Sequence, residues 1–216
     1  MAGLLIINPN STEAMTASIL ASARAAMPGH PIDAWTSKDG PPAIQGPEDG
    51  ARAVPPLLKL IDQATGYDAI IIACFDDTGL AEAKTRAPVP VIGIGEAGYV
   101  TARLLGHRFS VVTTLPVSVP VLEGNIEATG FNDICARVRA SNVPVLALEE
   151  DPEGSLNKVT AEAKTAIDED GISAIVLGCA GMTGLQERIE ALGVKAIDGV
   201  TAAVHLAKSA AVLKAS

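Results

Sequence analysis

The stretch AIIIACFDDTGL at residues 69–80 returns as AIVLGCAGMTGL at residues 174–185. The two copies share Ala, Ile, Cys, Thr, Gly and Leu without a gap. Their offset is 179 − 74 = 105 residues in a chain of 216 residues. In each copy, an apolar run typical of a buried strand ends at a cysteine. We therefore expect two similar α/β units, each presenting one cysteine at the carboxyl end of a strand.

The same offset relates other parts of the chain. It places Leu4–Asn8 on Phe109–Thr113, and both are apolar runs that end in a polar turn. It also places Ile92 on Ile197. Short β-branched runs alternate with longer Ala/Leu-rich amphipathic segments, which predicts right-handed βαβ units and largely parallel sheets. The nearly continuous apolar strands indicate sheets that are covered on both faces.

The hydrophobic pattern predicts individual elements as well. Strands are expected at residues 4–7, 32–35, 69–73, 90–94, 109–112, 143–148 and 174–178. Helices are expected at residues 13–27, 51–64, 96–105, 117–129 and 155–168. A Gly/Pro-rich loop spans residues 40–50. Thr78 and Thr183 are expected to cap the helices that follow the two cysteines.

These elements predict two lobes that face each other. We expect residues 1–97, with about 203–216, to form the first lobe and residues 98–202 to form the second. Open parallel sheets bind ligands at the carboxyl ends of their strands, where helix N-termini also point. Two facing lobes would bring Cys74 and Cys179 to one cleft from opposite sides.

Composition excludes several classes of function. Hydrophobic residues make up 48% of the chain and charged residues 19%, which is typical of a globular protein. The formal net charge is -9 and no stretch is rich in Lys or Arg, which argues against nucleic acid and anionic membranes as partners. No apolar run approaches the roughly 20 residues of a membrane span. The N-terminus lacks the basic region of a signal peptide, so we expect a cytoplasmic protein.

Three cysteines are an odd number, and in a reducing compartment we expect all three to be free thiols. Cysteine often packs as a small hydrophobic residue, and this interpretation is preferred for Cys135, which has no partner in the repeat. Cys74 and Cys179 occupy equivalent positions, each followed by small or polar residues, and this symmetry favours chemistry.

No metal and no cofactor are expected. Asp76 and Asp77 are adjacent carboxylates without a nearby His, and such pairs more often cap a helix or line a turn than bind a metal. The segment 93–95 has the sequence GIG, which lacks the third glycine of a dinucleotide-binding loop. No lysine stands in a motif that would hold pyridoxal phosphate.

Five segments together resemble the hydantoin and allantoin racemases of the aspartate/glutamate racemase superfamily. They are INPNST, ACFDDTGL, VPVIGIGEA, VVTT and LGCAGM, and the resemblance runs from Ile6 to the helix after Asp198. It implies an α/β fold of two pseudo-symmetric Rossmann-like lobes with parallel sheets and the active site in the cleft between them. This agrees with the repeat found from the residues alone.

The resemblance also implies roles for single residues. It makes Cys74 and Cys179 the catalytic acid/base pair. The substrate-binding residues that it implies are Pro9, Asn10, Phe75 and Asp76 in the first lobe and Thr113, Thr114, Gly178, Ala180 and Gly181 in the second. The segment around Gln45 is similar to a family segment that usually carries Glu, so the role of position 45 and the substrate side group stay open. Arylmalonate decarboxylases keep only one of the two cysteines, so the presence of both favours racemisation.

The expected reaction is a cofactor-independent racemisation of a 5-substituted hydantoin or of allantoin. One thiolate removes a proton from the stereogenic carbon, and the second thiol returns a proton on the opposite face. An unperturbed thiol has a pKa of about 8.5, and an adjacent helix N-terminus would increase the thiolate fraction. Backbone N–H groups at residues 75–76 and 180–181 are expected to face the carbonyl oxygen that gains charge.

Two alternatives remain open at this point. Other enzymes of the superfamily, such as amino-acid racemases, maleate-type isomerases and decarboxylases, act on carboxylates. The motifs expected in the cleft contain no Arg or Lys, which favours a neutral cyclic ureide as the small-molecule substrate. A two-lobed redox or ligand-binding protein would instead form a disulfide between Cys74 and Cys179 and would show no turnover. A homo-oligomer is expected, and the sequence does not tell which cysteine serves which enantiomer.

Overall fold

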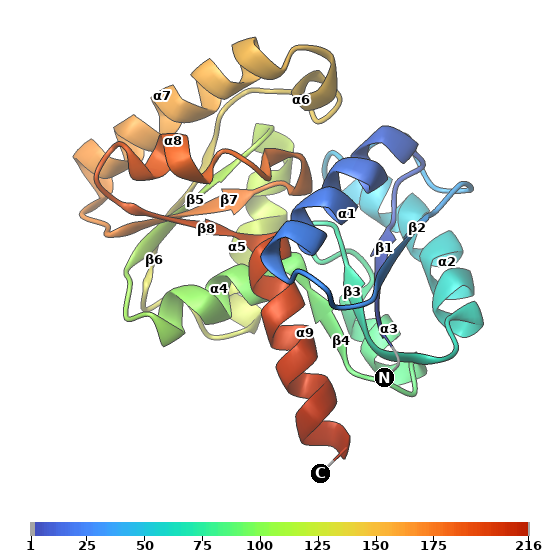
Figure 1. The fold of residues 1–216 in the computed structure, drawn as a ribbon. Coiled ribbons are helices and arrows are strands. Elements are labelled where there is room, and N and C mark those ends of the chain that lie inside the picture. Colours follow the sequence, from blue (N-terminus) through green and yellow to red (C-terminus); the bar gives the residue numbers. More distant parts are fainter. Residues whose placement is uncertain (1–2, 216) are drawn as a thin grey trace.

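Two four-stranded sheets form the frame of the molecule (Figure 1). The structure is a computed structural model and describes residues 3–215. The first sheet has the order β2-β1-β3-β4, and the second has the order β6-β5-β7-β8. The strands are β1 (Gly3–Asn8), β2 (Ile32–Thr36), β3 (Tyr67–Ile72), β4 (Val91–Gly93), β5 (Phe109–Thr113), β6 (Cys135–Ala140), β7 (Ala174–Gly178) and β8 (Lys195–Asp198). All neighbouring strands are parallel, and the equal order of the two sheets confirms the expected two-lobed α/β fold.

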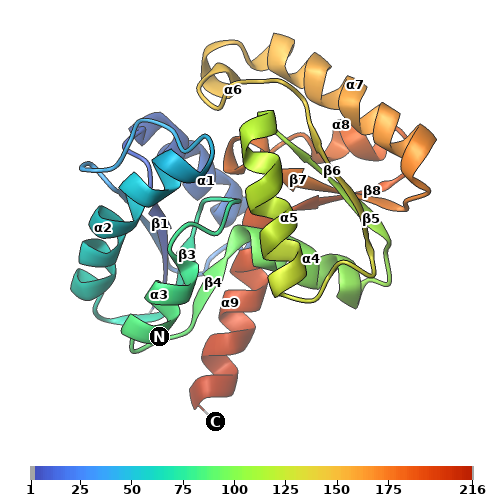
Figure 2. The same ribbon diagram turned by 180° about the vertical axis from the view of Figure 1, so that it is seen from behind.

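Helices cover both faces of each sheet (Figures 1 and 2). The α-helices are α1 (Glu13–Ala26), α2 (Pro47–Gln63), α3 (Leu80–Arg86), α4 (Ile94–Leu104), α5 (Val119–Ala128), α6 (Ala147–Glu150), α7 (Pro152–Asp170), α8 (Gln186–Glu190) and α9 (Gly199–Ala215). Two short 3-10 helices, η1 (Pro116–Ser118) and η2 (Ala180–Met182), follow β5 and β7. The described helices include none that is long and apolar enough to cross a membrane.

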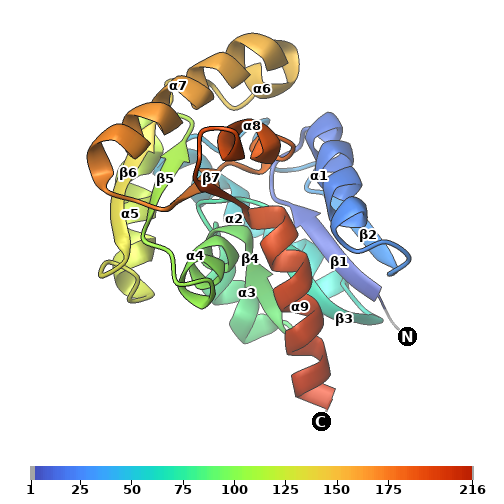
Figure 3. The ribbon, with the colours of Figure 1, turned by 60° about the vertical axis from the view of Figure 1, so that its left-hand side comes forward.

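The apolar strands are buried on both faces because alternate side chains point to opposite layers. Leu4 and Ile6 of β1 belong to the core cluster that contains residues of α1 and α9, whereas Leu5 and Ile7 belong to the cluster that contains residues of α2. The second sheet is covered by α7 and α8 on one face and by α4 and α5 on the other (Figure 3). The long apolar runs of the sequence therefore have a direct structural reason.

A group of aromatic rings joins the two lobes. Tyr99 of α4 is fully buried, and its ring stacks on Phe109 of β5 with centroids 5.9 Å apart. The same ring meets Phe75, which follows β3, edge-on at 5.7 Å. Such aromatic pairs add about 0.5–1.5 kcal/mol each beyond the burial of their area. This shared core fixes the turn after β3 relative to the second sheet.

One predicted strand is wrong. Residues 143–146 form a loop that leads into α6, and the sixth strand is β6 at Cys135–Ala140. β6 is an edge strand and carries Arg137 and Arg139, so it lacks the apolar run by which most of the other strands were predicted; β8 was not predicted as a strand either. The apolar residues at 143–148 pack instead as parts of a loop and a short helix, and Pro144 offers no N–H for a sheet.

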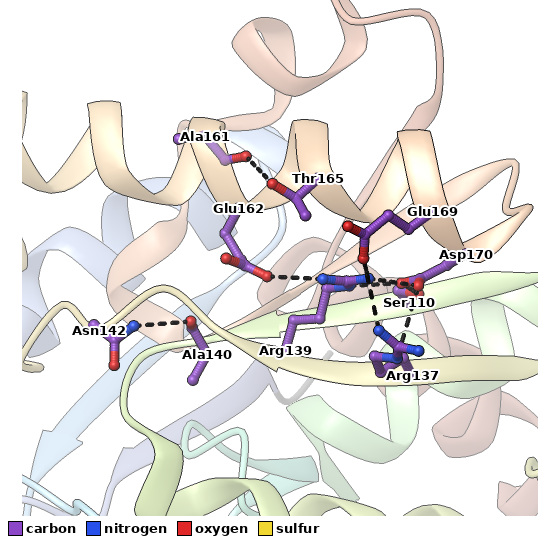
Figure 4. A network of polar contacts seen from close by, with 10 residues as sticks. All are labelled: Ser110, Arg137, Arg139, Ala140, Asn142, Ala161, Glu162, Thr165, Glu169 and Asp170. Atoms are coloured by element: carbon purple, nitrogen blue, oxygen red, sulfur yellow. Dashed lines mark hydrogen bonds and ion pairs between the residues drawn. The ribbon is translucent and has the colours of Figure 1, made fainter.

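The arginines of β6 bind the end of α7 (Figure 4). Arg139 donates to both carboxylate oxygens of Asp170 at 2.7 Å, and these side chains are 8% and 2% exposed. Arg139 also binds Glu169 at 2.6 Å, while Ser110 of β5 donates to Asp170 at 2.7 Å. This network holds α7 on the outer face of the second sheet, where the sequence pattern gave no sign of a charged cluster.

Candidate active site

Cys74 and Cys179 lie at equivalent strand ends and line one cavity. Cys179 directly follows β7, and Cys74 follows β3 with Ala73 between them. The cavity is lined by Asn10, Met15, Ile44, Ala73, Cys74, Phe75, Asp76, Thr114, Ser118, Val145, Gly178, Cys179 and Ala180. Its volume of about 30 Å³ is enough for one or two water molecules. The carboxyl ends of the two sheets thus enclose a small space with one thiol from each lobe.

The turns after the two cysteines have the same hydrogen-bond plan. The N–H groups of Asp76 and Gly181 bind the sulfur atoms of Cys74 and Cys179, respectively. The next N–H groups along the chain, of residues 77 and 182, bind the carbonyl oxygens of the same two cysteines at 3.0 Å. The repeat seen in the sequence is therefore repeated in the backbone geometry around the thiols.

Burial is the main influence on both thiols. Burial raises the pKa of Cys74 well above its ordinary value, and the negative charge of Asp76 raises it further. The hydroxyl of Thr78, 3.4 Å from the sulfur of Cys74, and the Asp76 N–H act in the opposite direction. Burial raises the pKa of Cys179 to about 12, the Gly181 N–H lowers it, and the charges of Asp76 and Glu149 raise it. Both cysteines are consequently protonated at neutral pH. When either loses its proton, a hydrogen bond from the N–H of Asp76 or Gly181 stabilises the thiolate.

The predicted caps at Thr78 and Thr183 are wrong. The N-cap of α3 is Gly79, whose φ of 68° lies in the left-handed region that glycine adopts without strain. Thr183 is the last residue of the turn formed by η2, whose N-cap is Cys179 itself. Thr78 contacts the sulfur of Cys74 instead, so its hydroxyl supports the thiol rather than a helix.

The adjacent carboxylates of the first turn have different surroundings. Asp77 accepts the N–H groups of Gly95 at 3.0 Å and Glu96 at 2.7 Å, and thereby caps the start of α4. Asp76 faces the cavity and accepts one hydrogen bond from Ser118, at 3.3 Å. Within residues 3–215, no cluster of three His, Cys, Asp or Glu side chains could hold a metal ion.

Asn10 enters the cavity from the turn after β1. Its side-chain oxygen accepts the Asn8 side-chain amide at 2.8 Å and the Thr12 N–H at 3.0 Å. Its own amide nitrogen lies 3.2 Å from the sulfur of Met15. Asn10 is 5% exposed, and this buried network fixes the orientation of its amide.

Not every residue implied by the resemblance touches the cavity. Asn10, Phe75, Asp76, Thr114, Gly178 and Ala180 line it together with the two cysteines. The remaining three, Pro9, Thr113 and Gly181, are outside the lining. Thr113 donates its hydroxyl to the Gly178 carbonyl at 3.0 Å and so supports the wall from behind. Gly181 contributes through its N–H to Cys179.

The cavity also has a wall that sequence reasoning did not identify. Met15, Ser118 and Val145 line it without having been recognised in the sequence. A signal for Val145 was present, because the offset of 105 residues places residue 40, in the loop after β2, on residue 145, in the loop after β6. The two loops are equivalent, and both reach the cavity.

Gln45 connects these two loops across the cleft. Its side-chain oxygen accepts the backbone N–H of Val145 at 3.0 Å, while its own N–H donates to Asp49 at 3.1 Å. The neighbouring Gly46, with a φ of 96°, lies so close to Val117 that a Cβ would be 2.6 Å from its side chain. The first-lobe loop therefore contacts the second lobe directly.

Comparison with known proteins gives a consistent result. The sequence model of the family described as Asp/Glu/Hydantoin racemase matches residues 4–207. The chain is 48% identical to the hydantoin racemase of Rhizobium meliloti over 208 residues, which cover 94% of this chain and 86% of that protein. The hydantoin racemase of Pseudomonas sp. (strain NS671) is 38% identical over 208 residues, covering 94% of this chain and 84% of that protein.

Solved structures agree with the sequence relatives. The structure of allantoin racemase from Klebsiella pneumoniae superimposes with a TM-score of 0.94 at 40% identity, covering 99% of this chain and 89% of that chain. This agreement over nearly the whole chain confirms the two-lobed fold and its resemblance to these racemases.

Proposed function

The chain belongs to the Asp/Glu/hydantoin racemase family, and from this membership we propose that it is an isomerase that racemises 5-substituted hydantoins or allantoin. The observation that carries the proposal is that Cys74 and Cys179, from equivalent strand ends of the two lobes, line one cavity. The relatives named above are racemases of hydantoin and of allantoin. Allantoin is itself a hydantoin, and it carries a ureido group at the stereogenic ring carbon.

The two thiols divide the reaction between them. The thiolate of one cysteine takes the proton of the stereogenic carbon, so that a C–H bond breaks and an S–H bond forms. The electron pair spreads onto the neighbouring carbonyl oxygen. The thiol of the other cysteine then gives its proton to the opposite face, where a new C–H bond forms. The enzyme ends with the thiolate on the second cysteine, ready for the reverse reaction.

The protein supplies hydrogen-bond donors both for the thiolate and for the negative charge that develops on the carbonyl oxygen. The Thr78 hydroxyl and the N–H groups of Asp76 and Gly181 stabilise the thiolates. In both turns the N–H two residues after the cysteine, at residues 76 and 181, binds the sulfur. The N–H three residues after it, at residues 77 and 182, binds the carbonyl oxygen of the cysteine. We assign the first N–H of each turn, at Phe75 and Ala180, to the carbonyl oxygen that gains charge.

The cavity favours a neutral substrate. The described residues that line it contribute one charged side chain, Asp76, and no Lys, Arg or His. A carboxylate substrate would meet a negative charge there without a compensating cation. Met15, Ile44 and Val145 add aliphatic side chains to the wall, which favours an apolar 5-substituent over the ureido group of allantoin.

Further features of the sequence analysis belong to this proposal. Residues 1–97 with about 203–216 are proposed as the first lobe and residues 98–202 as the second. Thiols that must stay free suit a reducing compartment such as the cytoplasm. A homo-oligomer is proposed as well.

A substrate panel tests the function. Single enantiomers of a 5-isobutyl hydantoin, a 5-benzyl hydantoin, allantoin and glutamate are incubated with the protein, and optical rotation is followed against samples without enzyme. We expect the fastest enzyme-dependent loss of rotation with the 5-isobutyl hydantoin and none with glutamate. The same rate with and without enzyme for every hydantoin and for allantoin would refute the proposal.

A further inference from the structure

The side chain of Asp76 occupies a position that the two-thiol reaction does not explain. It lines the cavity together with both cysteines, and its charge raises the pKa of both thiols. Its backbone is fixed on both sides, because its N–H binds the sulfur of Cys74 and its carbonyl accepts the side-chain amide of Asn125 at 2.8 Å. A carboxylate held in this place works against the formation of either thiolate.

Asp76 also has fewer partners than the other buried carboxylates of the chain. Its carboxylate accepts one bond, from Ser118 at 3.3 Å, although a carboxylate offers about four acceptor positions. Asp77 has two short bonds from α4, and Asp170 has the guanidinium of Arg139. Burial raises the pKa of Asp76 to about 6, with Ser118 acting weakly in the opposite direction. Most of its acceptor capacity therefore has no donor among the described residues, and Asp76 lines the cavity.

A cyclic ureide offers what this carboxylate lacks. Its ring carries two N–H donors, of which N1–H is bonded next to the reacting carbon C5, and a hydrogen bond to a charged acceptor is among the stronger ones in proteins. We propose that Asp76 is a specificity-determining residue that accepts a ring N–H of the substrate and discriminates against substrates that carry a carboxylate. This inference rests on the proposed function and names the contact by which the ureide ring is recognised.

The surroundings of Asp76 fit this role. Ser118, 2% exposed, positions the carboxylate from η1, and no cation is present among the described lining residues to compete for it. The ionisable groups that act on one another here are Asp76, Cys74 and Cys179, with Glu149 at the second thiol and the buried Tyr99, whose pKa the charge of Asp76 also raises. A substrate N–H that binds Asp76 takes up part of its charge and so weakens its effect on the thiols. Substrate recognition and thiolate formation are thereby linked.

Methylation of the ring nitrogens tests the contact directly. Values of kcat/KM are measured for a 5-isobutyl hydantoin and for its N1-methyl and N3-methyl derivatives, with the unmodified protein and with Asp76→Ala and Asp76→Asn. We expect methylation of one of the two nitrogens to lower kcat/KM of the unmodified protein by about 10- to 100-fold, the range of a bond to a charged group. In Asp76→Ala, that methylation penalty should largely disappear, because the acceptor is gone. Asp76→Asn, which keeps the shape but not the charge, should show an intermediate penalty.

A neighbouring carboxylate provides the control. Glu149→Gln removes a charge that also acts on Cys179 but does not line the cavity. We expect this variant to keep the full methylation penalty, whereas Ser118→Ala, which loses the group that positions Asp76, should reduce it in part. Circular dichroism of each variant establishes that the fold is retained.

The possible failures are distinguishable. If the unmodified protein racemises the parent hydantoin but Asp76→Ala and Asp76→Asn keep the same methylation penalty as the unmodified protein, the inference is overturned while the proposed function stands. The inference is likewise overturned if neither N1-methylation nor N3-methylation lowers kcat/KM of the unmodified protein. If the unmodified protein racemises neither a hydantoin nor allantoin, the proposed function fails and this inference fails with it.

Discussion

The backbone N–H of Val145 donates to the side-chain oxygen of Gln45 at 3.0 Å, and this bond connects two loops that lie 100 residues apart in the chain. Each loop also contributes an apolar side chain to the cavity, Ile44 from one and Val145 from the other. The bond therefore connects the two lobes beside the cavity.

Removal of this bond is expected to loosen the wall of the cavity and to lower activity. Gln45→Ala should lower kcat/KM by up to about tenfold, because one hydrogen bond contributes about 0.5–1.5 kcal/mol. Gln45→Glu should retain more activity than Gln45→Ala, since a carboxylate oxygen can accept the same N–H. Steady-state kinetics with a 5-isobutyl hydantoin measure both variants. Equal activity of Gln45→Ala and the unmodified protein would show that the bond does not contribute to catalysis.

Each of the two thiols that line the cavity is expected to be essential for inversion. Cys74→Ser and Cys179→Ser should each reduce racemisation by at least about 10²- to 10⁴-fold, the usual contribution of a general acid or base. Each variant should still exchange the reacting proton with solvent for one enantiomer only, because one base remains. Chiral chromatography with mass detection in deuterated buffer follows both events.

Cys135 provides the matched control for the thiol variants. It lies on β6, outside the cavity, and burial raises its pKa to about 11. Cys135→Ser should therefore keep full racemase activity. Loss of activity in Cys135→Ser, or racemisation that persists in either Cys74→Ser or Cys179→Ser, would contradict the assignment.

The pH profile should reflect the buried thiols. Because burial raises the pKa of Cys179 to about 12 and that of Cys74 further, the thiolate fraction, and with it kcat/KM, should rise with pH throughout the alkaline range in which the protein is folded. The charge of Asp76 raises both values, so its removal in Asp76→Asn should move the rising limb to lower pH. Initial rates, corrected for spontaneous racemisation, measure the shift. A rising limb that stays in place or moves to higher pH would contradict this coupling.

The network on α7 should make stability depend on acid pH. Arg139 lowers the pKa of Asp170, so the ionised Asp170 stabilises the fold above the ordinary aspartate pKa of about 3.9, and this contribution is lost as pH falls through the lowered value. Asp170→Asn leaves Arg139 with less compensation and should lower the free energy of unfolding by about 3–5 kcal/mol near neutrality. Urea unfolding measures the difference, which should shrink below pH 4. A difference that is constant with pH would contradict the ion-pair account.

The sequence predicted most of the frame because most strands are buried on both faces. Leu4–Ile7 and Ala174–Gly178 are continuous apolar runs for that reason. β6 escaped recognition because, as an edge strand, it carries arginines that bind α7. Carrying the offset of 105 residues from residues 32–35 to residues 137–140 would have located it.

The site was predictable only in part. The two cysteines follow apolar strands in a repeat, so their common location could be inferred from residue positions. Met15, Ser118 and Val145 reach the cavity from a helix, a short turn and a loop whose paths depend on packing between the lobes. The different roles of Asp76 and Asp77 likewise depend on the left-handed conformation of Asp77, with a φ of 49°, which no residue pattern indicated.

The isotope content of the product tests the two-thiol reaction most directly. A single, unlabelled enantiomer of a 5-isobutyl hydantoin is incubated with the protein in deuterated buffer, and the reaction is stopped at low conversion. The two enantiomers are then separated, and mass spectrometry measures the deuterium content of each. If Cys74 and Cys179 act from opposite faces, the newly formed enantiomer carries deuterium from the second thiol, while the remaining substrate keeps its hydrogen. A product that retains the substrate's hydrogen would mean that one group performs both transfers, and the central claim would be wrong.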